Sequence, residues 1–183
     1  MKILAFAGSL RSGSYNRKLL KNALEILGGR AEIDLLDLRE VAMPIYDGDI
    51  EAAQGLPEGA RQFKQRIAAA DALLLATPEY NNSVPGGLKN AIDWASRPPG
   101  NPFRGKVVLL IGASPGQFGA ARSVLAVRQI LNALFAIVIP QTVLLPEADQ
   151  AFDETGNLKE TTVRTSLEKA CAELLRVTAA LKR

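Results

Sequence analysis

The run GSLRSGSYN at residues 8–16 combines the chemical groups that bind phosphate. Its serine hydroxyls can donate hydrogen bonds, the Arg11 guanidinium suits an oxyanion, and its two glycines allow close backbone approach. A helix that starts after such a loop adds free N–H groups and the positive end of its dipole. The spacing is neither that of a nucleotide P-loop nor that of the dinucleotide GxGxxG motif. The residues alone therefore predict a phosphate site, with an ordinary capped turn as the alternative.

Two further loops carry small and amide residues. The run TPEYNNSVPGG at residues 77–87 has two prolines and two glycines, which make it rigid and allow close approach. Its backbone N–H groups and the Asn81 amide could hydrogen-bond a planar heterocycle, with Tyr80 packing nearby. Glu79 could be a general base, although no second carboxylate stands near it in the sequence. The run GASPGQFG at residues 112–119 could close over the same ring.

The sequence contains no histidine and one cysteine. Without histidine, Ser-His-Asp and Cys-His catalysis are excluded, and so is the commonest zinc ligand. We predict no metal site. Cys171 falls in the apolar stripe of an expected helix, so we expect a buried, inert thiol. Any chemistry must come from carboxylates, amines, hydroxyls, backbone groups or a bound cofactor.

The composition fits one globular domain over residues 1–183. Of these residues, 48% are hydrophobic and 22% charged, and the net charge is +3. This charge is too weak to argue for nucleic acid, and no basic cluster is interleaved with aromatic residues. The apolar run at the N-terminus lacks a cleavage pattern and is typical of a buried strand. We therefore expect a cytoplasmic protein with neither a nucleic-acid nor a membrane partner.

Apolar runs and helical periodicity alternate along the chain, which predicts an α/β protein with a parallel sheet and helices on both faces. Ligands bind such sheets at the carboxyl ends of the strands, where all three loops begin. The irregular residues 39–55 could cover a ligand or a partner subunit. Strands are expected at 2–7, 31–36, 71–77, 106–112 and 136–139, with a further extended piece at 142–145, and helices at 16–27, 58–69, 85–95, 120–134 and 158–181.

The motifs GSLRSGSYN and PEYNNSVPGGLKNAIDWAS together resemble the NADPH-dependent FMN reductase family, which includes bacterial chromate, quinone and azo-dye reductases. The resemblance covers nearly the whole chain, including the GASPGQFG loop. It implies a flavodoxin-like, three-layer α/β/α fold whose five parallel strands have the order 2-1-3-4-5. It also implies a homodimer or homotetramer with the flavin near a subunit interface. Trp94 and residues 43–47 could serve that interface, or could be ordinary core and surface residues.

The resemblance further implies FMN-binding residues in all three loops. The phosphate would be bound by Ser9, Arg11, Ser14 and Asn16, together with the backbone around Leu10 and Tyr15. The isoalloxazine ring would lie along Pro78, Glu79, Tyr80, Asn81 and Ser83. The last loop would contribute Ser114, Gly116 and Gln117.

The activity implied is FMN-dependent NAD(P)H oxidation coupled to reduction of quinones, flavins, azo compounds or metal oxyanions such as chromate. In a ping-pong cycle, NADPH or NADH would reduce bound FMN and leave before the small-molecule acceptor enters. No catalytic side chain is required, because a flavin carries the redox chemistry itself. Backbone N–H groups near its pyrimidine edge would stabilise negative charge. Arg17, Lys18 and Arg122 are candidates for the 2′-phosphate of NADPH, with solvated surface charges as the simpler alternative.

Two other classes of protein stay open. A flavodoxin-type electron carrier would bind FMN without oxidising NAD(P)H directly. Such carriers are typically strongly acidic, whereas this chain is net basic. A module that binds phosphate or a partner protein without flavin is the other alternative.

Overall fold

The most apolar runs of the chain form the central strands. In the computed structural model, β1 (Lys2–Ala7), β3 (Ala72–Thr77) and β4 (Val107–Ala113) are buried along almost their whole length. Helices cover both faces of these parallel strands, so each strand is apolar over nearly its whole length. The edge strands β2 (Glu32–Leu36) and β5 (Ile137–Leu145) are only partly buried. The structure describes residues 1–182; Arg183, the last residue of the predicted domain, lies outside the described part.

All strand pairs are parallel, and the order is β2-β1-β3-β4-β5, as predicted. After β2 the chain crosses over β1 to form β3, so the winding direction reverses between β1 and β3. Open α/β sheets bind ligands outside the carboxyl ends of the strands at such a switch point. The loops after Ala7, Thr77 and Ala113 therefore stand where a ligand is expected.

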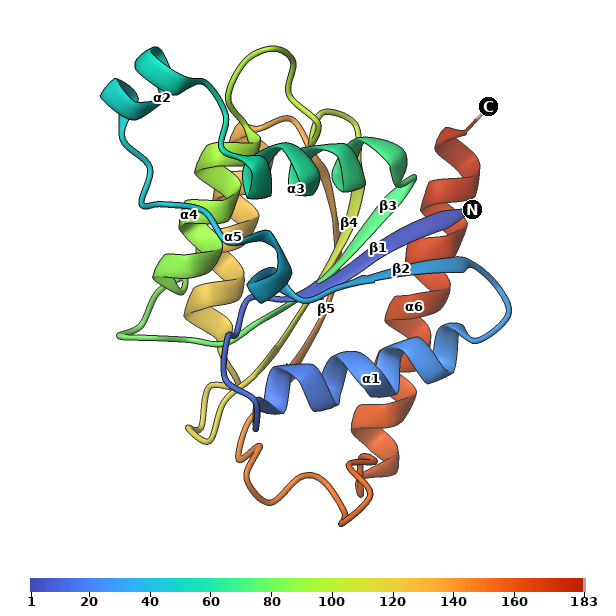
Figure 1. Cartoon of the computed structure of the whole chain (residues 1–183). Helices are drawn as coiled ribbons and strands as arrows, with labels where there is room; N and C mark the ends of the chain where they lie inside the picture. Colours follow the sequence, from blue (N-terminus) through green and yellow to red (C-terminus); the bar gives the residue numbers. More distant parts are fainter. Residues whose placement is uncertain (183) are drawn as a thin grey trace.

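Helices form the two outer layers of the predicted three-layer fold (Figure 1). Helices α1 (Tyr15–Leu27) and α6 (Thr161–Leu181) cover one face of the sheet, while α3 (Glu58–Ala69), α4 (Gly86–Ala95) and α5 (Ala121–Ala133) cover the other. The strands supply alternate side chains to the two apolar cores. No helix within residues 1–182 is long and apolar enough to span a bilayer.

Two differences from the expected elements concern surface segments. Residues 39–55 were expected to be irregular but include most of a short 3-10 helix, η1 (Leu38–Val41), and helix α2 (Gly48–Gln54). Because α2 buries no residue, it has no apolar periodicity that the sequence could reveal. The last helix begins at Thr161 and not at 158, since the buried Leu158 instead pairs with Phe152 in an isolated bridge.

Strand β5 is continuous, whereas we expected two extended pieces. Its register against β4 shifts in the middle: Val138 lies opposite Val108, but Thr142 lies opposite Leu110. Pro140 falls in the shifted stretch. Because proline has no N–H to donate to a neighbouring strand, it is tolerated at such an irregularity in an edge strand.

Trp94 is a core residue, so it does not present a side chain to a subunit interface. It is fully buried within the chain, and its Nε1 donates a hydrogen bond of 2.8 Å to the carbonyl oxygen of Pro44. Its ring packs edge-on against Tyr46, with centroids 5.0 Å apart. In the neighbouring stretch 43–47, the large apolar side chain of Ile45 projects into solvent, with 86% of its surface exposed.

Candidate functional site

The three predicted loops meet in one small cavity at the carboxyl edge of the sheet. Its volume is about 60 Å³. A single water needs roughly 10–15 Å³, so the cavity suits a compact group such as a phosphate, and a larger ligand would extend out of it. The cavity is lined by Ser9, Arg11, Ser14, Tyr15, Asn16, Pro78, Glu79, Tyr80, Ala113, Ser114 and Pro115.

The first loop offers hydrogen-bond donors that the chain itself does not use. Ser14 caps α1, and its Oγ accepts from the N–H of Arg17 at 3.4 Å. The N–H groups of Tyr15 and Asn16 have no acceptor within the described residues. The first turn of α1 also carries no acidic residue, so no carboxylate of its own neutralises the positive end of the helix dipole. This end of α1 therefore suits an anion.

Ser9 and Asn16 are buried polar residues that shape this loop. Each is 2% exposed. The Ser9 hydroxyl accepts from the N–H of Arg11 at 3.4 Å. Both ends of the Asn16 side-chain amide are bonded to the backbone of Ala113, so its backbone N–H is the group left for a ligand. Leu10, half exposed, does not line the cavity.

The second loop contains a tight turn whose tip stands outside the cavity. The backbones of Tyr80 and Ser83 exchange two hydrogen bonds, at 3.1 and 3.0 Å. Between them Asn81 (φ 48°) and Asn82 (φ 61°) both have left-handed backbones, which asparagine tolerates well. The turn conformation thus explains why asparagine stands at both positions. Asn81 and Ser83 lie at the exposed tip of the turn, beside the cavity and not in its wall.

The Glu79 carboxylate faces helix α5. It accepts from the N–H of Arg122 at 2.9 Å, from the N–H of Ser123 at 3.3 Å and from Nη1 of Arg122 at 3.1 Å. The side chain is only 11% exposed. With both oxygens engaged, Glu79 is not arranged as a free general base.

In the third loop, Ser114 closes a short turn. Its Oγ accepts from the N–H of Gly116 at 3.1 Å, and its backbone is bonded to Leu145 and Ala148. Gly116 and Gln117 are exposed and lie outside the cavity wall. Ala113 and Pro115 do line the cavity but were not predicted, because neither side chain carries a chemical signal.

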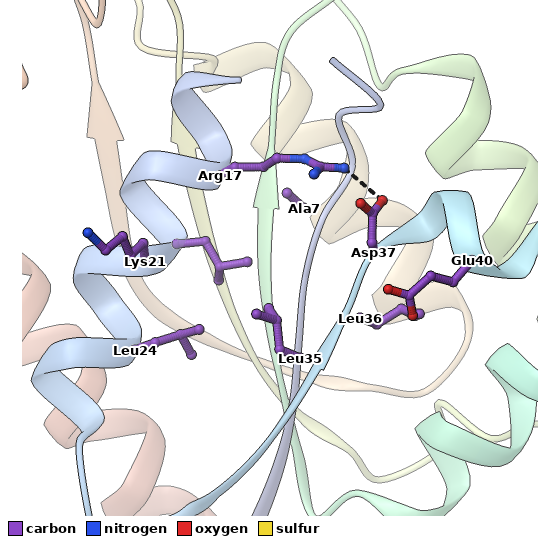
Figure 2. Close-up of a pocket in the computed structure, with 9 residues that line it drawn as sticks. Ala7, Arg17, Lys21, Leu24, Leu35, Leu36, Asp37 and Glu40 are labelled. Carbon is purple, nitrogen blue, oxygen red and sulfur yellow. Dashed lines mark hydrogen bonds and ion pairs between the residues drawn. The ribbon is translucent and has the colours of Figure 1, made fainter. Parts of the chain in front are cut away.

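A separate groove of about 330 Å³ lies between α1 and β2. Figure 2 shows Arg17 reaching from α1 across this groove to Asp37, at the end of β2. The distance from Arg17 Nη2 to Asp37 Oδ1 is 2.7 Å. Hydrogen bonds from Arg39 and then from Arg17 hold the pKa of Asp37 well below its usual range. The rest of the lining is mostly leucine, and none of the predicted FMN-binding residues is part of it.

The three cations considered for the 2′-phosphate all have partners in the chain. Arg17 pairs with Asp37, and Arg122 pairs with Glu79. Lys18 Nζ lies 5.9 Å from the ring centroid of Tyr15 and 5.7 Å from that of Phe152. These contacts favour structural roles over recognition of the donor.

Cys171 is buried, as expected, and burial raises the pKa of its thiol to about 12. The thiol therefore stays protonated at neutral pH and is not a nucleophile. Within residues 1–182, no group of three or more acidic, cysteine or histidine side chains is arranged to hold a metal ion.

Comparisons with known proteins show that this chain is similar to flavin-dependent reductases. The family model described as NADPH-dependent FMN reductase matches residues 1–150. An NAD(P)H-dependent FMN reductase of Pseudomonas aeruginosa is 44% identical over 172 residues, which are 92% of this chain and 90% of that protein. A quinone reductase of Escherichia coli K12 is 41% identical over 140 residues, 76% of this chain and 73% of that protein.

A solved structure also resembles this chain over nearly its full length. The flavoenzyme NAD(P)H:(acceptor) oxidoreductase FerB from Paracoccus denitrificans superposes with a TM-score of 0.85 at 34% identity. The match covers 98% of this chain and 97% of that one. The similarity therefore extends over the sheet, both helical layers and all three loops.

Proposed function

Because the chain belongs to the NADPH-dependent FMN reductase family, we propose that it is an FMN-dependent NAD(P)H oxidoreductase of small-molecule acceptors. The observation that carries the proposal is the cavity at the start of α1. It combines the free N–H groups of Tyr15 and Asn16 with serine hydroxyls and Arg11, and no acidic side chain lies in the first turn of the helix. Such a set of donors suits a phosphate dianion.

The donor set and the three loops fit FMN. The first loop would hold the phosphate through Ser9, Arg11, Ser14 and the backbone of Tyr15 and Asn16. The larger part of the cofactor would leave the cavity along Pro78, Tyr80 and Ser114, which line its wall. FMN would supply the redox chemistry when bound, taking a hydride from NADPH or NADH and passing electrons to an acceptor. The chain's own task is to bind, orient and shield the cofactor.

The residues around the opening support an acceptor that is planar and largely apolar. Tyr80 lines the cavity and is 45% exposed, and Phe118, in the third loop, is 58% exposed. Such rings can stack on a quinone, a free flavin or an azo compound. The relatives named quinone reductase favour quinones among these acceptors. Chromate remains in the proposal as a metal oxyanion that an exposed flavin could reduce.

We extend the proposal to a single domain over residues 1–183 that assembles as a homodimer or homotetramer in the cytoplasm. Tyr80 lines the cavity, and the exposed apolar side chains of Tyr80, of Phe118 in the third loop and of Leu125 in α5 support an interface that includes this part of the surface. A lone buried cysteine is consistent with a reducing compartment.

The test uses the purified protein mixed with FMN. We expect flavin absorption bands shifted from those of free FMN, and NAD(P)H oxidation that depends on an added quinone. Stopped-flow mixing with NADPH in the absence of acceptor separates the two flavin-binding alternatives, since an electron carrier would not be reduced directly. A protein that stays colourless after FMN addition and oxidises no NAD(P)H with quinone would contradict the proposal. A panel of NADH and NADPH against several acceptors then identifies the preferred pair.

A further inference from the structure

Helix α5 begins without a cap of its own. The residue at its N-cap position is Ala120, with a left-handed backbone (φ 69°) and no capping side chain. Its first turn carries no acidic residue. The first N–H groups of any α-helix lack partners within the helix, and a buried helix end without substitutes is costly. Some other part of the chain must therefore satisfy the start of α5.

Glu79, 43 residues earlier in the chain, supplies the missing cap. One carboxylate oxygen accepts from the N–H groups of Arg122 and Ser123, at 2.9 and 3.3 Å. The other oxygen accepts from the Arg122 guanidinium at 3.1 Å. A negative charge at this end of the helix is also favoured by the helix dipole. The carboxylate thus joins the loop after β3 to the first turn of α5.

A second contact between β3 and α5 reinforces this junction. The hydroxyls of Thr77 and Ser123 lie 2.8 Å apart, and both residues are fully buried. Thr77 is the last residue of β3, immediately before Pro78 and Glu79. The loop is therefore fixed to α5 at two successive points.

From these contacts we propose that Glu79 is a positioning residue and not a direct ligand of FMN. It fastens the second loop to α5 and so keeps the cofactor cavity in shape. The part that concerns FMN rests on the proposed function. Glu79 lines the cavity, but its oxygens already accept hydrogen bonds from Arg122 and Ser123. Pro78 and Tyr80, on either side of it, line the same cavity and depend on where Glu79 is held.

The first test needs no cofactor. Hydrogen exchange of the apo protein should show faster exchange of the Arg122 and Ser123 amides in Glu79→Ala, by at least about tenfold, because an uncapped first turn opens more often. Arg122→Ala removes the ion pair but keeps both backbone hydrogen bonds, so it should leave these amides protected. Unchanged exchange of both amides in Glu79→Ala would overturn the proposal.

The second test measures FMN affinity by quenching of flavin fluorescence. If the loop is correctly placed in only a tenth of Glu79→Ala molecules, the apparent Kd rises about tenfold. The apparent Kd of Glu79→Gln should stay within about threefold of the wild-type value, since a Gln oxygen can still cap the helix. The same is expected of Arg122→Ala, because it keeps both backbone hydrogen bonds to Glu79. A direct electrostatic role toward FMN would instead make Glu79→Gln as weak as Glu79→Ala, and that result would overturn the proposal.

Arg128→Ala is the control for general loss of stability. Arg128 lies on the same helix but bonds to the carbonyl oxygens of Val138 and Ile139 in β5, away from the cavity. This variant should lower the unfolding midpoint and leave FMN affinity unchanged. If Glu79→Ala does not fold, Glu79→Asp takes its place, because the shorter aspartate side chain cannot reach the amides of both Arg122 and Ser123. Unchanged amide exchange and unchanged FMN affinity in Glu79→Asp would equally overturn the proposal. If the wild type binds no FMN, the proposed function fails, while the exchange experiment still tests the junction.

Discussion

The side-chain amide of Asn16 is bonded at both ends to the backbone of Ala113. Its Nδ2 donates to the Ala113 carbonyl oxygen and its Oδ1 accepts from the Ala113 N–H, each at 2.9 Å. The two residues are 97 positions apart, and the contact is buried. It joins the start of α1 to the end of β4, so the first and third loops of the cavity are held at a fixed separation.

Replacing Asn16 with Leu should destabilise the protein and weaken FMN binding. Leucine has a similar size but leaves a buried N–H and a buried carbonyl of Ala113 without partners, which costs about 2–3 kcal/mol. Urea unfolding measures the loss of stability, and flavin fluorescence measures the affinity. Asn132→Leu, at an exposed position of α5, is the matched control and should change the unfolding free energy by less than about 0.5 kcal/mol. Equal unfolding midpoints for Asn16→Leu and the wild type would show that the paired hydrogen bonds contribute nothing.

Replacing Arg11 with Ala should weaken FMN retention more than turnover at saturating FMN. Loss of one charge-assisted contact to phosphate corresponds to about a tenfold to hundredfold higher Kd. Riboflavin, which lacks the phosphate, should bind wild type and variant equally well. Arg104→Ala, near the amino end of β4, controls for loss of a surface cation. A variant that loses FMN and riboflavin affinity alike would place Arg11 away from the phosphate.

Sheet and helical layers were predictable because each element has a distinct apolar pattern. Residues 72–76 and 107–113 carry no polar side chain, as is typical of central parallel strands. Helix α2 gave no such signal, because it buries nothing. The register shift of β5 was equally hidden, since it is a change of pairing with β4 that no apolar pattern marks.

The site was predictable as three loops but not as individual contacts. Ser9, Arg11 and Ser14 have side chains whose chemistry suggests phosphate, and they do line the cavity. Ala113 contributes through its backbone, which no residue type reveals. The attachment of Glu79 to Arg122 joins residues 43 positions apart, so only the folded chain shows that this cavity-lining glutamate also caps a helix.

Gly119 and Gly116 should respond differently to alanine, although they lie in the same loop. Gly119 has φ +55°, and a Cβ there would approach the backbone nitrogen of Leu145 to 2.8 Å. A Cβ on Gly116 would meet only the Ser114 hydroxyl, at an ordinary 3.5 Å. We expect Gly119→Ala to lower the unfolding free energy by about 2 kcal/mol, combining left-handed strain with a steric clash, and to weaken FMN binding. Gly116→Ala should be nearly neutral in unfolding; similar losses for the two variants would contradict this distinction.

The contacts of Asp37 with Arg39 and Arg17 should make the free energy of unfolding depend on pH in the acid range. Hydrogen bonds from Arg39 and Arg17 lower the pKa of Asp37 in the folded protein. The folded state thus binds the proton of this carboxyl less readily than the unfolded state, where the pKa is about 3.9. The stabilisation is fully present above that value and is lost as the pH falls through about 4 and below.

Asp37→Asn should therefore be less stable than the wild type at pH 7, and the difference should shrink toward pH 3. Because the pair is partly open to water, we expect about 1 kcal/mol at neutral pH. Urea unfolding at pH 7, 5, 4 and 3 gives the comparison, with Asp149→Asn, at an exposed position, as the control. FMN affinity at pH 7 should be unaffected, since Asp37 lines the groove beside β2 and not the cavity. A stability difference that is the same at pH 3 and at pH 7 would mean that the asparagine acts through packing and not through the lost charge.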